Sequence, residues 1–411
     1  MNTTLHVNAH RLEASIAELA RIGALDGGGV CRLAFGDADK RARDFVEQRM
    51  RELGLTVRID RIGNILGTRP GRRQGPIVAA GSHVDTVATG GRYDGAAGVM
   101  AALEIIASLN DAGVETDLPV GVLSFVNEEG ARFVPDMMGS LVVRGDLSVE
   151  DARRAVDRDG VTVGAAVDRL GYAGADDFSR LDLRAYLELH IEQGPMLERT
   201  GRTIGVVEAV QGLTWITYTL TGAAAHAGTT PIDMRRDAGL VAGRVIQFAR
   251  TLSQEIEGQR ATVGAVAFAP NIVNVVAERV RLTVDLRNPD AERLALAERR
   301  LAAFVHDAAA AEGVTVSAAT DVRVPPARFD ADLVARVQTA ADALGHSSMR
   351  MTSGAGHDAQ ILSARFPAAM IFVPSHGGVS HNVTEFTSPD DLAAGANVLL
   401  QTLVGLAESG H

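Results

Sequence analysis

Five short stretches of the chain concentrate the residue types that bind metal ions or transfer protons. Each combines glycine or polar residues with at least one histidine, aspartate or glutamate, and they span residues 81–85, 91–95, 127–130, 188–194 and 380–382. Three of these stretches directly follow an apolar run that is typical of a buried strand. Because the carboxyl ends of neighbouring parallel strands meet at one edge of a sheet, we expect these side chains to converge on one cleft.

The expected cleft holds three imidazoles and two carboxylates, supplied by His83, His190, His381, Asp94 and Glu129. This mixture suits zinc and similar first-row divalent ions. Five ligands are too many for one tetrahedral ion that keeps an open position, but they suit two ions that share a bridging carboxylate. The sequence therefore predicts two divalent metal ions per subunit. Zinc is the favoured metal, and manganese, cobalt and nickel are alternatives.

Two further acids are predicted to support this chemistry. Glu128 is the neighbour of Glu129, so the two cannot easily ligate the same ion. One can bind metal while the other removes a proton from water, which predicts Glu128 as the general base. Asp85 follows His83 by two residues and lies on the same side of an extended chain. It is predicted to orient that imidazole through the second ring nitrogen.

Each motif, taken alone, has an ordinary structural explanation. A single buried histidine is usually structural, a Glu-Glu pair is usually a solvated helix start, and a G-x-x-D-G run is usually a turn. The coincidence of five such motifs after apolar runs is what favours a metal site.

The elements that would position these residues alternate between strands and helices. Helices are predicted at 38–53 and 96–109, and strands at 56–59, 64–67, 76–81 and 120–126. Residues 141–183 are predicted to form a small helical excursion before the strand-like pattern resumes at 186–194. Buried strands that alternate with helices predict an α/β domain with helices on both faces of its sheet.

The middle of the chain carries a different pattern. Strands are predicted at 212–220, 261–267 and 280–285, helices at 236–253 and 291–312, and a last strand near Val324. This β-α-β-β-α-β order predicts an inserted domain of ferredoxin-like type. Pro325 and Pro326 mark the return, so the expected domains are 1–211 with 329–411, and 212–328.

Composition narrows the class of protein and its compartment. The 411 residues include 40 basic and 51 acidic residues, for a net charge of −11, which argues against a general nucleic-acid binder but not against an anionic substrate. Cys31 is the only cysteine, which favours a reducing compartment. No apolar run is long enough to span a bilayer. We therefore expect a cytoplasmic protein without membrane or nucleic-acid partners.

At the residues discussed above, the sequence resembles the M20 metallopeptidase family. The resemblance rests on GSHVDTV, GGRYDGAAGV, NEEGARF, ELHIEQG, AHAGTTP, VNVV, DLRNPD, SGAGHDAQ and GVSHN, and it runs from Gly81 to the C-terminal helix. Within the family it is most similar to the branch of N-carbamoyl-L-amino-acid hydrolases, allantoate amidohydrolases and β-ureidopropionases. It implies a metal-dependent exopeptidase-like catalytic domain and an inserted α+β domain that serves as lid and homodimer interface.

The resemblance also implies how the ligands are divided. One ion would be held by His83, Asp94 and His190 and the other by Asp94, Glu129 and His381, with Glu128 as the base. General M20 peptidases carry an acidic residue where this chain has His190, so the histidine favours the carbamoyl-hydrolase branch. The family pattern further implies a cis peptide bond after the bridging aspartate Asp94.

Substrate contacts are likewise implied by the resemblance. His226, which alone would pass for a polar loop residue, would donate to the substrate carbonyl from the partner subunit's lid, although the sequence leaves open whether it acts within its own chain. Arg287 would clamp the substrate carboxylate with Asn274 beside it, since a guanidinium fork suits a carboxylate. Gly356 would offer its N–H to the same carboxylate, and Gln193 would contact the ureido group.

The expected activity is hydrolysis of the carbamoyl C–N bond of an N-carbamoyl-L-amino acid, which gives the amino acid, carbon dioxide and ammonia. Allantoate, β-ureidopropionate and ureidoglycolate remain alternative substrates, and the loop at 374–381 favours the N-carbamoyl-L-amino acid over them. A non-catalytic binding protein on the same scaffold is opposed by Glu128 and the complete ligand set. A nucleotide-binding enzyme is opposed by residues 90–98, which contain neither G-x-G-x-x-G nor a Walker lysine.

Overall fold

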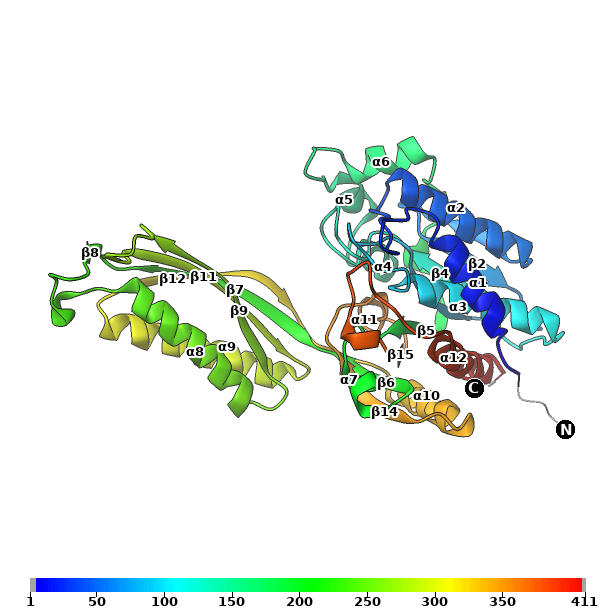
Figure 1. Cartoon of the computed structure of the whole chain (residues 1–411). Coiled ribbons are helices and arrows are strands. Elements are labelled where there is room, and N and C mark those ends of the chain that lie inside the picture. Colours follow the sequence, from blue (N-terminus) through cyan, green and yellow to red (C-terminus); the bar gives the residue numbers. More distant parts are fainter. Residues whose placement is uncertain (1–4, 409–411) are drawn as a thin grey trace. The chain divides into compact units, whose positions relative to one another are not determined.

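The computed structural model describes residues 5–408, and the chain divides into two compact units (Figure 1). One unit comprises Met1–Glu208 and Arg328–His411, and the other comprises Ala209–Ala327. Within residues 5–408, no helix combines the length and the apolar character that crossing a membrane requires.

A mixed nine-stranded sheet forms the centre of the first unit, in the order β1-β2-β4-β3-β5-β15-β6-β13 with β14 paired to β6. Its strands are β1 (Thr56–Ile59), β2 (Ile65–Arg69), β3 (Ile77–His83), β4 (Val120–Phe125), β5 (Leu183–Ile191), β6 (Ile204–Val210), β13 (Ala327–Arg328), β14 (Ser348–Ser353) and β15 (Ala368–Val373). The central strands β4, β3, β5 and β15 are parallel. Their carboxyl ends therefore share one edge, as the sequence predicted.

Helices cover both faces of this sheet. Adjacent strand residues point to opposite faces, and on β5 the side chain of Leu189 packs against Gly395 of α12, whereas Glu188 accepts the N–H of Ala359 in α11. This confirms the predicted α/β layering. The helices are α1 (Ala9–Leu19), α2 (Asp37–Glu52), α3 (Ala96–Asp111), α4 (Met138–Arg144), α5 (Val149–Arg154), α6 (Val163–Leu170), α7 (Met196–Thr200), α10 (Ala331–Ala343), α11 (Asp358–Leu362) and α12 (Pro389–Glu408), with short 3-10 turns η1 (Phe178–Arg180) and η3 (His376–Gly378).

The second unit has an antiparallel sheet in the order β12-β7-β11-β9. Its elements are β7 (Gly212–Thr221), α8 (Ala238–Glu255), β9 (Arg260–Ala269), β11 (Arg279–Asn288), α9 (Ala291–Ala311) and β12 (Thr315–Val324), with a small β8 (Ala225–His226) and β10 (Val275–Val276) ribbon and a 3-10 turn η2 (Ile232–Met234). Helices α8 and α9 pack on each other and on this sheet. The arrangement is the ferredoxin-like one that the order of elements predicted.

The burial pattern of β7 and the start of α8 can be compared with the predicted elements of this unit. On β7 the side chains of Ile216, Tyr218 and Leu220 are buried in the core, whereas Trp215 is exposed, as expected for a strand with one face on the core. Helix α8 begins two residues later than predicted because the Asp237 carboxylate accepts the N–H groups of the first turn and caps the helix.

Candidate metal centre

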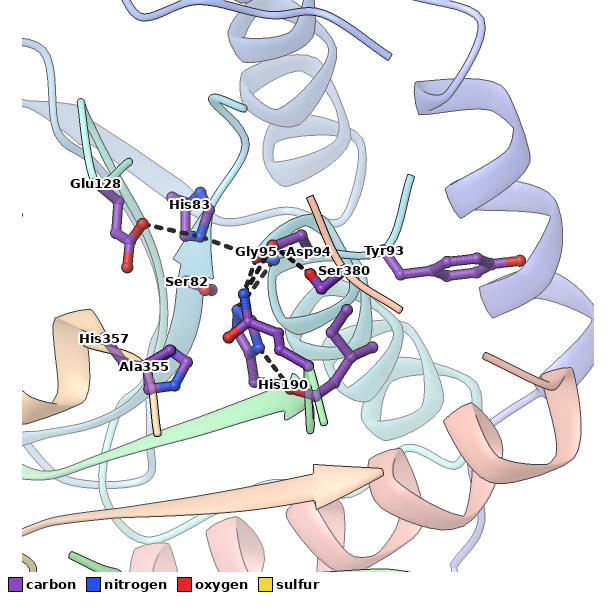
Figure 2. A network of polar contacts seen from close by, with 12 residues as sticks. Ser82, His83, Tyr93, Asp94, Gly95, Glu128, His190, Ala355, His357 and Ser380 are labelled. Atoms are coloured by element: carbon purple, nitrogen blue, oxygen red, sulfur yellow. Dashed lines mark hydrogen bonds and ion pairs between the residues drawn. The ribbon is translucent and has the colours of Figure 1, made fainter. Parts of the chain in front are cut away.

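The predicted metal ligands meet at the carboxyl edge of the parallel strands. His83 ends β3 and His190 lies at the end of β5, while Glu129 follows β4 by four residues. Asp94 precedes α3, and His381 follows β15 in the loop after η3. Figure 2 shows His83 and His190 directed toward Asp94 at the middle of the polar network.

The two carboxylate oxygens of Asp94 face different partners. Asp94 Oδ1 lies 3.2 Å from His190 Nε2 and 3.8 Å from His83 Nε2. Asp94 Oδ2 lies 3.3 Å from His381 Nε2, which in turn lies 3.5 Å from Glu129 Oε2. The donor atoms of each set lie within 4.8 Å of one another. The Asp94 carboxylate is thus shared by two clusters of three donors and contributes one oxygen to each.

The donor set fits a pair of cations. Ligand atoms about 2.1 Å from a tetrahedral ion are about 3.4 Å apart, which is close to the distances across both clusters. Among the described residues, the ion pairs of Asp94, Glu128 and Glu129 involve histidines only. Buried carboxylates without an arginine or lysine are destabilising unless cations balance them. The residues present therefore suit divalent metal ions.

The imidazoles are oriented as metal ligands. His83 Nδ1 lies 3.0 Å from the backbone oxygen of Asp85, and His190 Nδ1 lies 2.9 Å from that of Ile191. Because a carbonyl only accepts hydrogen bonds, each Nδ1 must donate, so Nε2 is the ring nitrogen left to bind a metal ion. The link from Asp85 to His83 thus runs chiefly through the backbone, since the carboxylate Oδ1 is 3.9 Å away.

The carboxylate of Asp85 has a different task from the one predicted. Its two oxygens accept the N–H groups of Glu128 and Glu129, each at 3.3 Å. Asp85 therefore fixes the backbone from which both glutamates project. A side chain two residues from His83 reaches the neighbouring strand end because β3 and β4 are parallel partners in register, with His83 opposite Phe125.

Burial and charge shift the titration of the site. Burial lowers the pKa of His83 to about 4, which keeps this imidazole neutral. Although burial opposes ionisation of Asp94, its contacts with His190 and His381 hold its pKa well below the usual range. Burial, followed by the charges of Asp358 and Glu129, raises the pKa of Glu128 well above its usual value. Bound cations would oppose this last shift.

Glu128 lies at the centre without belonging to either donor cluster. Its Oε2 is 3.4 Å from His83 Nε2, and the residue is 5% exposed. It also lines a cavity of about 160 Å³ that opens beside both clusters. That cavity is bounded by Asp94, Glu128, Glu129, Asp136, Met137, His190, Gln193, Ala355, Gly356, His357 and His381. One cavity is thus lined by the predicted base Glu128, by Gln193, the predicted ureido contact, and by Gly356, the predicted carboxylate contact.

The turn after Asp94 differs from the expected one. Among the described residues the cis peptide bonds are Val134–Pro135 and Ala269–Pro270, so the expected cis bond at Asp94–Gly95 is wrong. Gly95 instead adopts φ +61°, and the N–H of Ala96 donates to the Asp94 carbonyl at 2.5 Å. This γ-turn reverses the chain without a cis bond.

Three predicted substrate residues belong to the second unit. His226 and Asn274 are neighbours there, because His226 pairs with Val275 across the β8–β10 ribbon and Ala227 N–H donates to the Asn274 carbonyl. Arg287 lies near the far end of β11, where its guanidinium contacts Asp285 at 3.0 Å. Asn274 therefore does not lie beside Arg287 in one chain, contrary to expectation.

Several supporting residues were not predicted, or were noted without a defined contact. Fully buried Glu188 accepts Ser82 Oγ at 2.6 Å and the Ala359 N–H at 2.9 Å. The ring of His357 packs edge-on against His190, with centroids 4.6 Å apart. Glu385 joins the Asp94 and Ser380 loops. The available signal for Glu385 was an acid four residues after a metal-ligand histidine, which by itself indicates no contact.

The fold and the donor pattern together define a two-unit hydrolase of the metal-dependent kind. The chain belongs to peptidase family M20/M25/M40, which matches residues 79–404. It is 40% identical over 404 residues to an N-carbamoyl-L-amino-acid amidohydrolase of Rhizobium meliloti, covering 98% of this chain and 97% of the relative. It is 36% identical to an allantoate amidohydrolase of Bacillus subtilis, covering 95% of each.

The fold of this chain is also similar to that of a solved structure from the same group of enzymes. The crystal structure of an amidase of the hydantoinase/carbamoylase family from Burkholderia multivorans superposes with a TM-score of 0.95 at 43% identity, covering 98% of this chain and 99% of that one. The chain is accordingly a hydrolase of C–N bonds, an amidohydrolase, as the sequence predicted.

Proposed function

We propose that this protein hydrolyses the carbamoyl C–N bond of N-carbamoyl-L-amino acids with two divalent metal ions per subunit, zinc being the favoured metal. The observation that carries the proposal is the pair of oxygens of Asp94, one facing His83 and His190 and the other facing His381, which in turn contacts Glu129, with Glu128 beside them and outside both clusters. The relatives named N-carbamoyl-L-amino-acid amidohydrolase support the choice of substrate.

The chain's own residues supply the proton transfers. When bound, a pair of divalent ions lowers the pKa of water at the site and stabilises the developing negative charge. Glu128 would take a proton from the attacking water and pass it to the departing amino acid nitrogen as the C–N bond breaks. The other product, carbamate, decomposes to carbon dioxide and ammonia. His226 would donate to the carbonyl oxygen during the attack.

Different residues would bind the carboxylate and the ureido group of the substrate. The fork of Arg287 suits the α-carboxylate, with the N–H of Gly356 as a further donor. Gln193 would contact the ureido group, and its amide lies 2.9 Å from Asp94 Oδ2, close to where the reaction would take place.

A homodimer through the second unit is part of this proposal. Arg279 and Arg287 lie eight residues apart on β11, which corresponds to about 27 Å of extended chain. His226 and Asn274 lie beyond the Arg279 end. One substrate cannot span that distance, so a site that uses Arg287 together with His226 and Asn274 requires two chains. The lone cysteine and the net charge of −11 support a cytoplasmic location without nucleic-acid partners.

Allantoate is the second candidate substrate. It carries a carboxylate and two ureido groups, so the same donors suit it, and the Bacillus subtilis relative bears that name. β-Ureidopropionate and ureidoglycolate are further members of the same chemical class.

A substrate panel tests the proposal. The purified chain would be stripped of metal, reloaded with zinc or manganese, and assayed for ammonia release from N-carbamoyl-L-amino acids, allantoate, N-carbamoyl-β-alanine and ureidoglycolate. We expect the highest kcat/KM for an N-carbamoyl-L-amino acid, loss of activity with a chelator, and no turnover of the D enantiomer. Preference for allantoate would select the second candidate, and activity confined to N-acyl peptides would reject both.

A further inference from the structure

A buried glutamate contacts both the loop that carries the bridging ligand Asp94 and the loop that carries the ligand His381. Glu385 is 4% exposed and lies four residues beyond His381. Its Oε1 accepts the backbone N–H groups of Tyr93 and Asp94 at 3.1 and 3.2 Å. Its Oε2 accepts the Ser380 hydroxyl at 2.8 Å. All the contacts of this carboxylate thus lead to the proposed metal centre.

The backbone opposite Glu385 is shaped to admit the carboxylate. A Cβ atom at Gly91 would lie 2.0 Å from Glu385 Oε1 and 2.2 Å from its Cδ. Any side chain at position 91 would therefore displace the carboxylate from the Tyr93 and Asp94 N–H groups. This close approach is possible only because residue 91 is glycine.

The same contacts restrain both ends of the bridging aspartate. Ser380 Oγ lies 3.2 Å from Asp94 Oδ2, the oxygen that faces His381. Because a hydroxyl has one proton, Ser380 donates either to Glu385 Oε2 or to Asp94 Oδ2. Glu385 thereby holds the Asp94 backbone directly and fixes Ser380 beside the Asp94 carboxylate. His381 itself adopts φ +53°, a backbone conformation that is unfavourable for a histidine and persists only where its surroundings enforce it. The N–H of Glu385 donates to the Asn382 carbonyl and closes the turn after that histidine.

We propose that Glu385 is a positioning residue that locks the bridging carboxylate of Asp94 and the ligand His381 into one rigid unit, through the Tyr93 and Asp94 N–H groups and the Ser380 hydroxyl. The inference rests on the proposed two-metal site and adds a residue to which neither the motifs nor the relatives assign a role. Without this lock, Asp94 rotates more freely and the ion between His381 and Glu129 loses affinity.

Metal titration of four purified full-length proteins tests the proposal. Metal-free wild type, Glu385→Ala, Glu385→Gln and the control Glu104→Ala would be titrated with zinc by calorimetry, followed by kcat and KM of the loaded enzymes. Glu104 is a control of equal burial, because it is also 4% exposed and accepts a backbone N–H, from Asn8, and a serine hydroxyl, from Ser108; it differs from Glu385 in also pairing with Arg11 at 2.6 Å. Its contacts do not reach the metal centre.

We expect wild type to bind two ions and Glu385→Ala to bind the weaker one 10- to 100-fold less tightly, the usual effect of losing a partner of a metal ligand. Its kcat should fall at least tenfold while KM changes less than threefold. Glu385→Gln should stay within threefold of wild type, because its amide oxygen still accepts both N–H groups. Glu104→Ala should lower the melting temperature and leave zinc affinity unchanged.

The outcomes separate this inference from the proposed function. If wild type binds fewer than two ions, the two-metal proposal fails. If wild type binds two and Glu385→Ala matches its affinities and kcat, only the role of Glu385 is refuted. Equal damage from Gln and Ala would mean that charge matters and position does not, which also overturns the inference. Should Glu385→Ala not fold, Ser380→Ala decides, because unchanged zinc affinity there removes the proposed link to Asp94.

Discussion

Asp94 and the residues around it show how much one side chain depends on its immediate neighbours. Its carboxylate contacts His190, His381, Gln193 and Ser380, while its N–H is held by Glu385. Residue types predicted the ligands, because imidazole and carboxylate chemistry is a property of the residue itself. The supporting contacts could not be predicted in the same way, because Asp94 and Glu385 are 291 residues apart.

The first prediction at this scale concerns the proposed base. Glu128→Gln keeps the size of the side chain and the hydrogen bond from its N–H to Asp85, but it cannot accept a proton. We expect both zinc ions to remain bound and kcat to fall by about three orders of magnitude or more. Metal content and steady-state kinetics measure both. The contrasting variant Glu129→Gln should lose one ion, and full activity of Glu128→Gln would refute the assignment.

The second prediction concerns the glycine that follows Asp94. A Cβ at Gly95 would lie 2.3 Å from His83 Nε2 and would force that buried ring out of place. Gly95→Ala should therefore weaken zinc binding at least tenfold and reduce kcat/KM about 100-fold or more. Gly54→Ala is the control, because Gly54 also has positive φ but no atom within 4 Å of its Cβ position. Similar zinc affinity in the two variants would contradict this account.

At the scale of elements, strand ends were predictable and loop contacts were not. The apolar runs predicted at 76–81 and 120–126, and the strand-like pattern at 186–194, located the carboxyl ends of β3, β4 and β5 to within a few residues, since burial periodicity is a local property. The route from Asp85 to the Glu128 N–H depends on which strands are neighbours and in what register. That information arises only from pairing across the sheet.

The first turn of helix α2 provides a prediction about pH. Asp39 is buried, its carboxylate accepts the Phe35 N–H, and burial raises its pKa to about 7. Between pH 4, near the usual pKa of an aspartate, and pH 7, the folded state therefore holds a proton on Asp39 that the unfolded state has lost. This group stabilises the fold at low pH, and that stability is lost as pH rises through 7. The difference is on the order of 4 kcal/mol.

The variant Asp39→Asn isolates that contribution, because an amide keeps the acceptor for the Phe35 N–H but does not titrate. We expect the melting temperature of metal-free wild type, relative to Asp39→Asn, to fall between pH 5 and pH 8. A constant difference across that range would show that Asp39 does not carry the pH dependence.

At the scale of the whole molecule, mixing two inactive variants tests whether each active site takes residues from both chains of the dimer. If Arg287 serves its own chain's site and His226 serves the partner's, Arg287→Ala and His226→Ala are each inactive as homodimers. A mixed dimer then contains one intact site, so random exchange of subunits restores roughly a quarter of wild-type activity. The assay is ammonia release after co-refolding or co-expression. No recovery would place both residues on the same side, in their own chain or in the partner.

The sequence alone determined which chemistry the chain can perform and in which elements its ligands lie. Side-chain type and the periodicity of apolar residues are local properties, and they predicted the α/β domain, the ferredoxin-like insertion, and the convergence of His83, Asp94, Glu129, His190 and His381. Only the tertiary structure decided how those ligands are held. The γ-turn at Gly95, the Glu385 contacts and the separation of Arg287 from Asn274 depend on how distant segments pack and on the path of the chain between them.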